Sequence, residues 1–120
     1  MPVGVVIVDD QAVFRTAARE LIDATPGFRA IGEAACGAEG LRLVDDLDPE
    51  LVLVDMRMPG MDGVETARRM TGSHPRSLVV LISSSDLPAA ASHSGACTFV
   101  RKQDLCRDAL VAIWAEHGGG

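Results

Sequence analysis

Val5-Val6-Ile7-Val8-Asp9-Asp10 joins four apolar residues to two adjacent carboxylates. The stretch 51–55 repeats this arrangement, with four apolar residues followed directly by Asp55. Short continuous apolar runs are typical of strands that are buried on both faces of a parallel sheet. The carboxyl ends of such strands meet at one edge, so we expect Asp9, Asp10 and Asp55 to share a crevice there.

Similar β-branched runs alternate along the chain with segments of helical period, which is the pattern of repeated βαβ units. The pattern predicts one α/β domain over residues 1–117, with glycines 118–120 as a flexible tail or the beginning of a linker. Strands are expected near 3–8, 28–34, 51–54, 78–82 and 97–100.

Helices are expected between these strands. The first should stop at Pro26-Gly27, and the second should cover 37–47. Asp62 is placed to cap a third helix that runs to about Met70. A last helix should begin near Asp104, which can cap it, and end at His117. The segment 86–94 is too short and too rich in Pro and Ser for more than one or two helical turns.

The composition excludes several classes of protein. The chain has 17 acidic against 11 basic residues, a net charge of −6, and no cluster of Lys or Arg, so direct binding of nucleic acid is not expected. No apolar run is long enough for a signal peptide or a membrane span, so we expect a soluble, cytoplasmic protein. The three cysteines show no zinc-ligand spacing and are expected to be reduced thiols.

The three carboxylates would repel one another at close range, and a hard divalent cation such as Mg²⁺ would relieve that repulsion. Two more polar side chains follow apolar runs and should reach the same edge. Ser83 follows the fourth run, and Lys102, the only lysine in the chain, follows the fifth. Simpler readings are a helix cap for Asp9, a local backbone hydrogen bond for Ser83 and a solvated side chain for Lys102.

The acidic pair, the segment 55–63, Ser83, and Phe99 three positions before Lys102 together resemble the receiver domain of a two-component response regulator. The resemblance covers essentially the whole chain. The opening after Ile7 and the phrase Thr25-Pro26-Gly27-Phe28 are similar to receivers that precede a LuxR-type helix-turn-helix domain. The family implies a flavodoxin-like, doubly wound five-stranded parallel sheet in the order 2-1-3-4-5.

The resemblance also implies a role for each site residue. Asp55 would be the phosphoacceptor, with a sensor histidine kinase as phosphodonor. Asp10, Asp55 and the backbone carbonyl of Arg57 would hold Mg²⁺, and Asp9 would act directly or through water. Lys102 and the Ser83 hydroxyl would bind phosphoryl oxygens. Phe99, expected in the core, would turn inward when Ser83 moves, and this switch would change contacts with a partner or output domain.

Two departures from the family pattern stand out. The fourth helix is expected to be shortened or irregular, because the spacing from Ser83 to Lys102 is compressed around 86–94. Gln103 stands where many receivers carry a proline with a cis bond, which leaves the geometry of that loop open.

Rival functions follow from these departures. One is a phosphate-independent receiver that acts as a dimerisation or ligand-responsive module. A homodimer would use the face around 86–117, near Leu105, Leu110 and Trp114. A hydrolase with Asp55 as nucleophile is disfavoured, since the second acid of such enzymes is replaced by Arg57. We therefore expect no enzyme beyond self-catalysed phosphotransfer and autodephosphorylation. The protein is expected either to regulate transcription through a DNA-binding domain outside this chain or to act as a stand-alone receiver.

Overall fold

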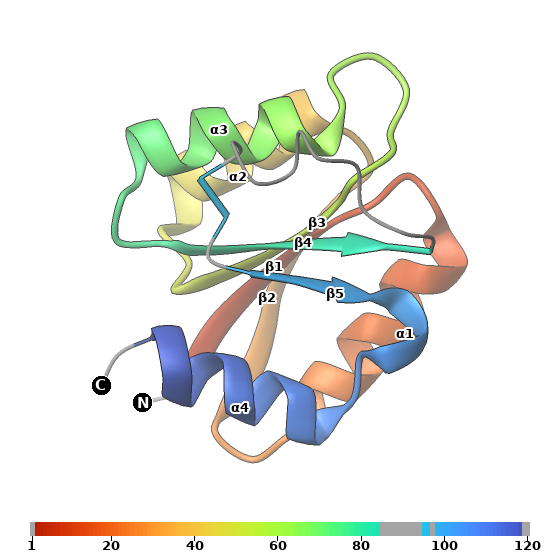
Figure 1. Cartoon of the computed structure of the whole chain (residues 1–120), viewed down its shortest axis with the longest axis vertical. Coiled ribbons are helices and arrows are strands. Elements are labelled where there is room, and N and C mark those ends of the chain that lie inside the picture. The colour runs from red at the N-terminus through yellow and green to blue at the C-terminus, as the bar shows by residue number, and fades with distance from the viewer. Residues whose placement is uncertain (1, 85–94, 97, 119–120) are drawn as a thin grey trace.

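A computed structural model describes residues 2–84, 95–96 and 98–118 of the chain (Figure 1). The elements alternate as predicted. In chain order they are β1 (Val3–Val8), α1 (Ala12–Asp23), β2 (Phe28–Ala34), α2 (Gly37–Leu47), β3 (Leu51–Asp55), α3 (Gly63–Ser73), β4 (Leu78–Ser83), β5 (Thr98–Arg101), the 3₁₀ helix η2 (Lys102–Asp104) and α4 (Arg107–His117).

The strands form one parallel sheet in the order β2-β1-β3-β4-β5, which confirms the predicted doubly wound fold. In Figure 1, α2 and α3 cover one face of this sheet, and α1 and α4 cover the other. The register places Asp55 opposite Ile82 and Ser83 opposite Arg101. The last residues of β3, β4 and β5 therefore lie side by side at the carboxyl edge.

The core consists of two layers, one on each face of the sheet, because successive strand residues point to opposite sides. Val6, Val52 and Leu81 pack with Val44 of α2 and Met70 of α3. Their strand neighbours pack on the other face, against α1 and α4; they include Val5, Ile7, Leu53, Val80 and Ile82. This burial on both faces explains why the central strands are apolar at every position up to the carboxyl edge.

The last helix begins later than predicted. Asp104 lies within η2, and the residue that precedes the first turn of α4 is Cys106, whose side chain makes no capping hydrogen bond. A tight turn accounts for this shift, since the Leu105 backbone N–H donates to the Lys102 carbonyl at 3.3 Å. The chain is then extended through Leu105 and Cys106, so a helix cannot start at Asp104.

Phe99 was expected in the core, and this expectation is wrong: 52% of the residue is exposed. Phe99 lies on the edge strand β5 opposite Leu81, on the face where α3 packs over β3 and β4. Its neighbour Val100 packs instead against the core beneath α4. The predicted irregular segment 86–94 lies outside the described residues.

The apolar residues suggested for a dimer face serve the core instead. Leu110 is fully buried, and Leu105 and Trp114 pack against the same cluster. Within 98–118, the large apolar side chains left exposed are Phe99 and Val111.

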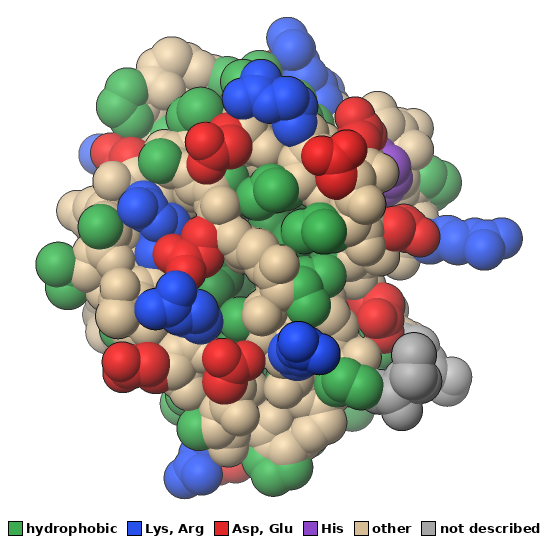
Figure 2. All heavy atoms as spheres, turned by 180° about the vertical axis from the view of Figure 1, so that it is seen from behind, with side chains coloured by type: hydrophobic (Ala, Val, Ile, Leu, Met, Phe, Trp, Pro, Cys, Tyr) green, Lys and Arg blue, Asp and Glu red, His purple; other side chains and the backbone are tan. Residues whose placement is uncertain are grey.

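The surface carries mixed charge. Figure 2 shows acidic and basic side chains interspersed on the face seen from behind, rather than one basic patch. None of the described helices is long and apolar enough to cross a membrane. Of the three cysteines, Cys36 and Cys106 are free thiols, half-buried and exposed respectively, and Cys97 lies outside the described residues.

Candidate functional site

The sheet brings the predicted polar residues together at its carboxyl edge. Asp9 follows β1, Asp55 ends β3, Ser83 ends β4 and Lys102 follows β5. The β1 and β3 strands are neighbours, as are β3 and β4. Residues separated by almost the full length of the chain therefore meet over the central strand β3.

Asp9 is held rigidly at the centre of this edge. Its residue is completely buried, and its Oδ1 accepts a 2.8 Å hydrogen bond from the backbone N–H of Gln11. Its backbone carbonyl accepts a 2.6 Å hydrogen bond from the guanidinium of Arg15, which also pairs with Glu33 of β2. These contacts fix the turn between β1 and α1 and aim the carboxylate at the crevice.

Among the described acids, Asp55 is the one whose pKa is strongly raised. Its pKa is raised from the ordinary 3.8 to about 6, chiefly by burial and also by the negative charges of Asp9 and Asp10. The ammonium of Lys102 and a hydrogen bond from the Arg57 backbone N–H lower it. A carboxylate ionised near neutral pH, yet poorly solvated, is suited to act as a nucleophile.

Lys102 reaches into the crevice from the loop after β5. Its Nζ lies 2.7 Å from Asp9 Oδ2 and 3.8 Å from Asp55 Oδ1. The side chain is only 14% exposed, so the reading of Lys102 as a solvated surface lysine does not hold. In this structure, the ammonium is closer to Asp9 than to the candidate nucleophile.

Three carboxylates form a cluster that suits a divalent cation. Asp9, Asp10 and Asp55 each offer an oxygen, and these oxygens lie within 4.8 Å of one another. Asp9 Oδ2 is buried, and its close partner among the described groups is the ammonium of Lys102 at 2.7 Å. A hard cation such as Mg²⁺ prefers carboxylate oxygens, and it would offset the negative charge that the three acids concentrate in one place.

Ser83 and Arg57 border the cluster. Ser83 is 2% exposed and directly follows Ile82, the residue opposite Asp55. Arg57 lies two residues beyond Asp55 with an exposed side chain. Asp62 is a helix cap rather than a member of the cluster, because its Oδ1 accepts a 2.9 Å hydrogen bond from the Glu65 backbone N–H.

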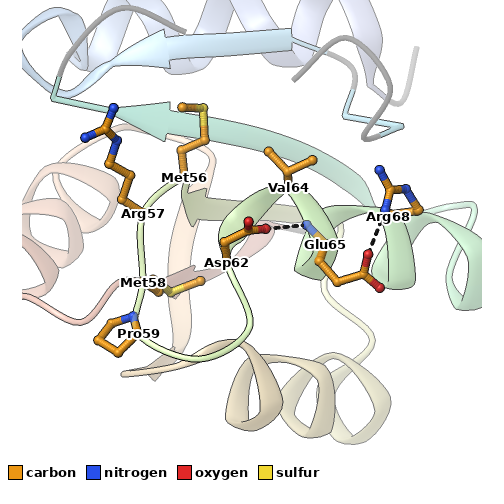
Figure 3. A pocket seen from close by; sticks show the side chains of 8 residues that line it. All are labelled: Met56, Arg57, Met58, Pro59, Asp62, Val64, Glu65 and Arg68. Atoms are coloured by element: carbon orange, nitrogen blue, oxygen red, sulfur yellow. Dashed lines mark hydrogen bonds and ion pairs between the residues drawn. The ribbon is translucent and has the colours of Figure 1, made fainter. Parts of the chain in front are cut away.

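A groove of about 720 Å³ lies beside the loop that follows Asp55 (Figure 3). Its lining residues come from this loop and the first turns of α3: Met56, Arg57, Met58, Pro59, Asp62, Val64, Glu65 and Arg68. The Glu65 carboxylate is engaged by Arg68 at 2.6 Å and by Arg69 at 2.8 Å. Because Asp62 and Glu65 serve the helix, the groove adds no second reactive acid to the site.

The structure adds two residues that the sequence did not single out. The Gln11 side-chain carbonyl accepts a 3.1 Å hydrogen bond from Lys102, and the Phe14 ring centroid lies 4.4 Å from Lys102 Nζ. Both residues belong to the beginning of α1. The helical spacing of the apolar residues in α1 gives Phe14 a place in the packing and no link to a lysine, and no sequence pattern relates Gln11 to a lysine 91 positions away.

Comparisons with known proteins agree with this geometry. The family model for the response regulator receiver domain matches residues 5–113. The chain is 35% identical to the nitrate/nitrite response regulator protein NarL of Escherichia coli K12, over 98% of this chain and 56% of that protein. It therefore spans about half the length of that relative.

Solved structures show the same similarity. The signal receiver domain of the putative response regulator NarL from Mycobacterium tuberculosis has a TM-score of 0.85 and 34% identity, covering 96% of this chain and 94% of that one. A LuxR-family two-component response regulator from Aurantimonas has a TM-score of 0.85 and 26% identity, covering 97% of this chain and 84% of that one.

Proposed function

The chain belongs to the response regulator receiver domain family of two-component systems, and we propose that Asp55 is the residue that accepts the phosphoryl group. The observation that carries this proposal is the poorly solvated Asp55 carboxylate, with two acids and one ammonium around it. The raised pKa of about 6 still leaves Asp55 ionised at neutral pH. Residues 1–117 would form the receiver, and 118–120 would begin a tail or linker.

The proposed reaction transfers a phosphoryl group without net oxidation or reduction. An Asp55 carboxylate oxygen attacks the phosphorus of a phosphohistidine, a new P–O bond forms, and the P–N bond breaks. The electron pair of that bond returns to the histidine ring. Asp55 then carries a mixed carboxylic-phosphoric anhydride, which water later hydrolyses to restore the carboxylate.

We propose Mg²⁺ as the cation of the site, held by Asp9, Asp10, Asp55 and the backbone carbonyl of Arg57. The cluster of three carboxylates, whose oxygens lie within 4.8 Å of one another, supports this assignment. When bound, Mg²⁺ offsets the charge on the nucleophile and on the incoming phosphoryl group. The protein's own task is to hold the acids in place, which Arg15 and Gln11 do for Asp9.

Lys102 and Ser83 would complete the phosphoryl site. The Lys102 ammonium would move its pairing from Asp9 to a phosphoryl oxygen, a short shift, since Asp55 is already 3.8 Å away. The Ser83 hydroxyl would bind another phosphoryl oxygen. Phe99 is exposed in this structure, so turning inward as Ser83 moves would change the surface of β5 and alter contacts with a partner or output domain.

The partner side of the proposal is a sensor histidine kinase, with a DNA-binding output domain outside this chain, in a cytoplasmic signalling pathway. Val13 of α1 is 85% exposed and borders a hollow that also involves Ala12 and Ala17. This end of α1 follows closely after Asp9 and Asp10, so it lies beside the edge that a kinase delivering phosphohistidine to Asp55 would approach. We therefore expect Val13 to contact the kinase.

Intact-mass spectrometry after incubation with acetyl phosphate tests the function. The natural chain should gain one phosphoryl group when Mg²⁺ is present and none when it is removed with EDTA. Asp55→Asn should gain nothing, whereas Asp62→Asn, which changes the helix cap alone, should be labelled as the natural chain is. A natural chain that is not labelled and does not bind Mg²⁺ would favour a phosphate-independent receiver.

A further inference from the structure

Two uncharged side chains, one just before α1 and one in its first turn, contact the Lys102 ammonium. The Gln11 side-chain carbonyl accepts a hydrogen bond from Nζ at 3.1 Å, and Nζ stands 4.4 Å from the centre of the Phe14 ring. Gln11 precedes the first turn of α1, but its side chain makes no capping hydrogen bond to the helix. The Gln11 side chain therefore binds Lys102 and does not cap the helix.

The remaining close contacts of Lys102 among the described residues are charged. They are the Asp9 carboxylate at 2.7 Å and the Asp55 carboxylate at 3.8 Å. A cation bound to Asp9 and Asp55 would weaken both attractions, because it neutralises the same oxygens. The contacts with Gln11 and Phe14 do not depend on that charge.

From these contacts we infer that Gln11 and Phe14 are positioning residues that keep the Lys102 ammonium beside Asp55 when the acids are neutralised. The inference rests on the proposed phosphoacceptor function. An amide carbonyl is a good acceptor for an ammonium, and the face of an aromatic ring attracts a cation. The Lys102 ammonium then stays in position to bind a phosphoryl oxygen on Asp55, and the side chain does not turn out into solvent.

The single lysine of the chain permits a direct test that needs no phosphorylation. In protein grown with ¹³C-labelled lysine, the methylene group next to Nζ gives one NMR signal. With Mg²⁺ present, its protons should be shifted upfield by the Phe14 ring. Phe14→Leu, which keeps an apolar side chain in the core, should move the signal toward the random-coil position, and Phe14→Tyr should not. A wild-type signal at the random-coil position would overturn the inference.

Labelling kinetics provide the second test. With acetyl phosphate and saturating Mg²⁺, Gln11→Met should slow labelling about tenfold, the scale of a hydrogen bond to a charged group. Phe14→Leu should slow it about threefold, the scale of an exposed cation–π contact. Thr16→Ala, an exposed change one turn further along α1, is the control and should leave the rate unchanged.

The Lys102→Met background separates positioning from a general effect on the fold. If Gln11 acts through Lys102, Gln11→Met should have no further effect there. An equal slowing in both backgrounds would overturn the inference. If the natural chain is not labelled at all, the phosphoacceptor proposal fails, and the NMR signal still decides whether Gln11 and Phe14 hold the lysine.

Discussion

Gly63 packs against the backbone of Asp55 so closely that no side chain fits between them. A Cβ at Gly63 would collide with the Asp55 carbonyl oxygen and lie 2.6 Å from the Met56 α-carbon. The backbone N–H of Gly63 donates to the Met56 carbonyl at 3.0 Å. The first residue of α3 is thereby fastened to the end of β3, and the loop that carries Arg57 is closed.

Gly63→Ala should therefore disrupt the loop next to the nucleophile. We expect it to lower the free energy of unfolding by about 3 kcal/mol, because the methyl group meets backbone that cannot move aside. Gly72→Ala is the matched control in the same helix, since a Cβ there meets nothing within 4 Å. The control should gain up to about 1 kcal/mol from helix propensity. Urea unfolding measures both, and equal stability of the two variants would contradict this packing.

Asp62→Ala should lower the free energy of unfolding by about 1 kcal/mol, the usual cost of a lost N-cap. The carboxylate accepts a hydrogen bond from the Glu65 backbone N–H at 2.9 Å, as Figure 3 shows. Asp62→Asn should keep most of this stability because Asn is also a good cap. Thermal unfolding separates the two variants, and a loss as large in Asp62→Asn would show that charge, not capping, is what matters.

Without divalent cations, Asp55→Asn should stabilise the protein at pH 7.5. Folding raises the pKa of Asp55 from 3.8 to about 6. Between these two pH values, the folded chain still holds a proton that the unfolded chain has lost. Stability therefore falls as the pH rises from about 4 to about 6.

The expected gain of the Asn variant is about 1–2 kcal/mol above pH 6, after allowance for solvent screening. It should shrink toward zero near pH 4, where the carboxyl group of the natural chain is protonated. Urea unfolding at pH 7.5 and pH 4.5 measures the difference. A gain that does not change between these pH values would show that Asp55 is not desolvated.

Mg²⁺ should stabilise the natural chain. At a hundred times its dissociation constant, a ligand that binds only the folded state adds about 2.7 kcal/mol. Asp10→Asn should reduce this gain by weakening the site, whereas Asp46→Asn, an exposed change on α2, should not. Thermal unfolding with MgCl₂, compared with NaCl of equal ionic strength, measures the effect. Equal stabilisation by both salts would argue against a specific cation site.

Most of the fold could be predicted from the sequence because the central strands are buried on both faces. The runs 5–8, 51–54 and 78–82 are apolar at every position, as expected for buried strands. Each of them is followed by a polar residue that marks the carboxyl edge of the sheet. The acids, Ser83 and Lys102 were found for the same reason. Asp9, Asp55, Ser83 and Lys102 end or directly follow a strand, and Asp10 comes next after Asp9.

The predictions that failed depend on turns and on strand positions in the sheet, which the local sequence pattern does not reveal. Asp104 has the chemistry of a cap, but a 3₁₀ turn moves the helix start beyond it. Phe99 is a large apolar residue in a strand, but this strand is at the edge of the sheet, and the face that carries Phe99 is half exposed there. The contacts of Gln11 and Phe14 with Lys102 join residues that are far apart in the sequence. They could be recognised only once the fold was known.

Borohydride reduction tests directly whether the phosphoryl group is attached to the carboxylate of Asp55. Borohydride reduces an aspartyl phosphate to an alcohol, which leaves homoserine in place of the modified residue. Protein labelled with acetyl phosphate and Mg²⁺ should therefore yield, after borohydride treatment and peptide mapping, homoserine at position 55 and aspartate at positions 9 and 10. Homoserine at position 9 or 10, or a labelled protein with no homoserine at all, would contradict the account.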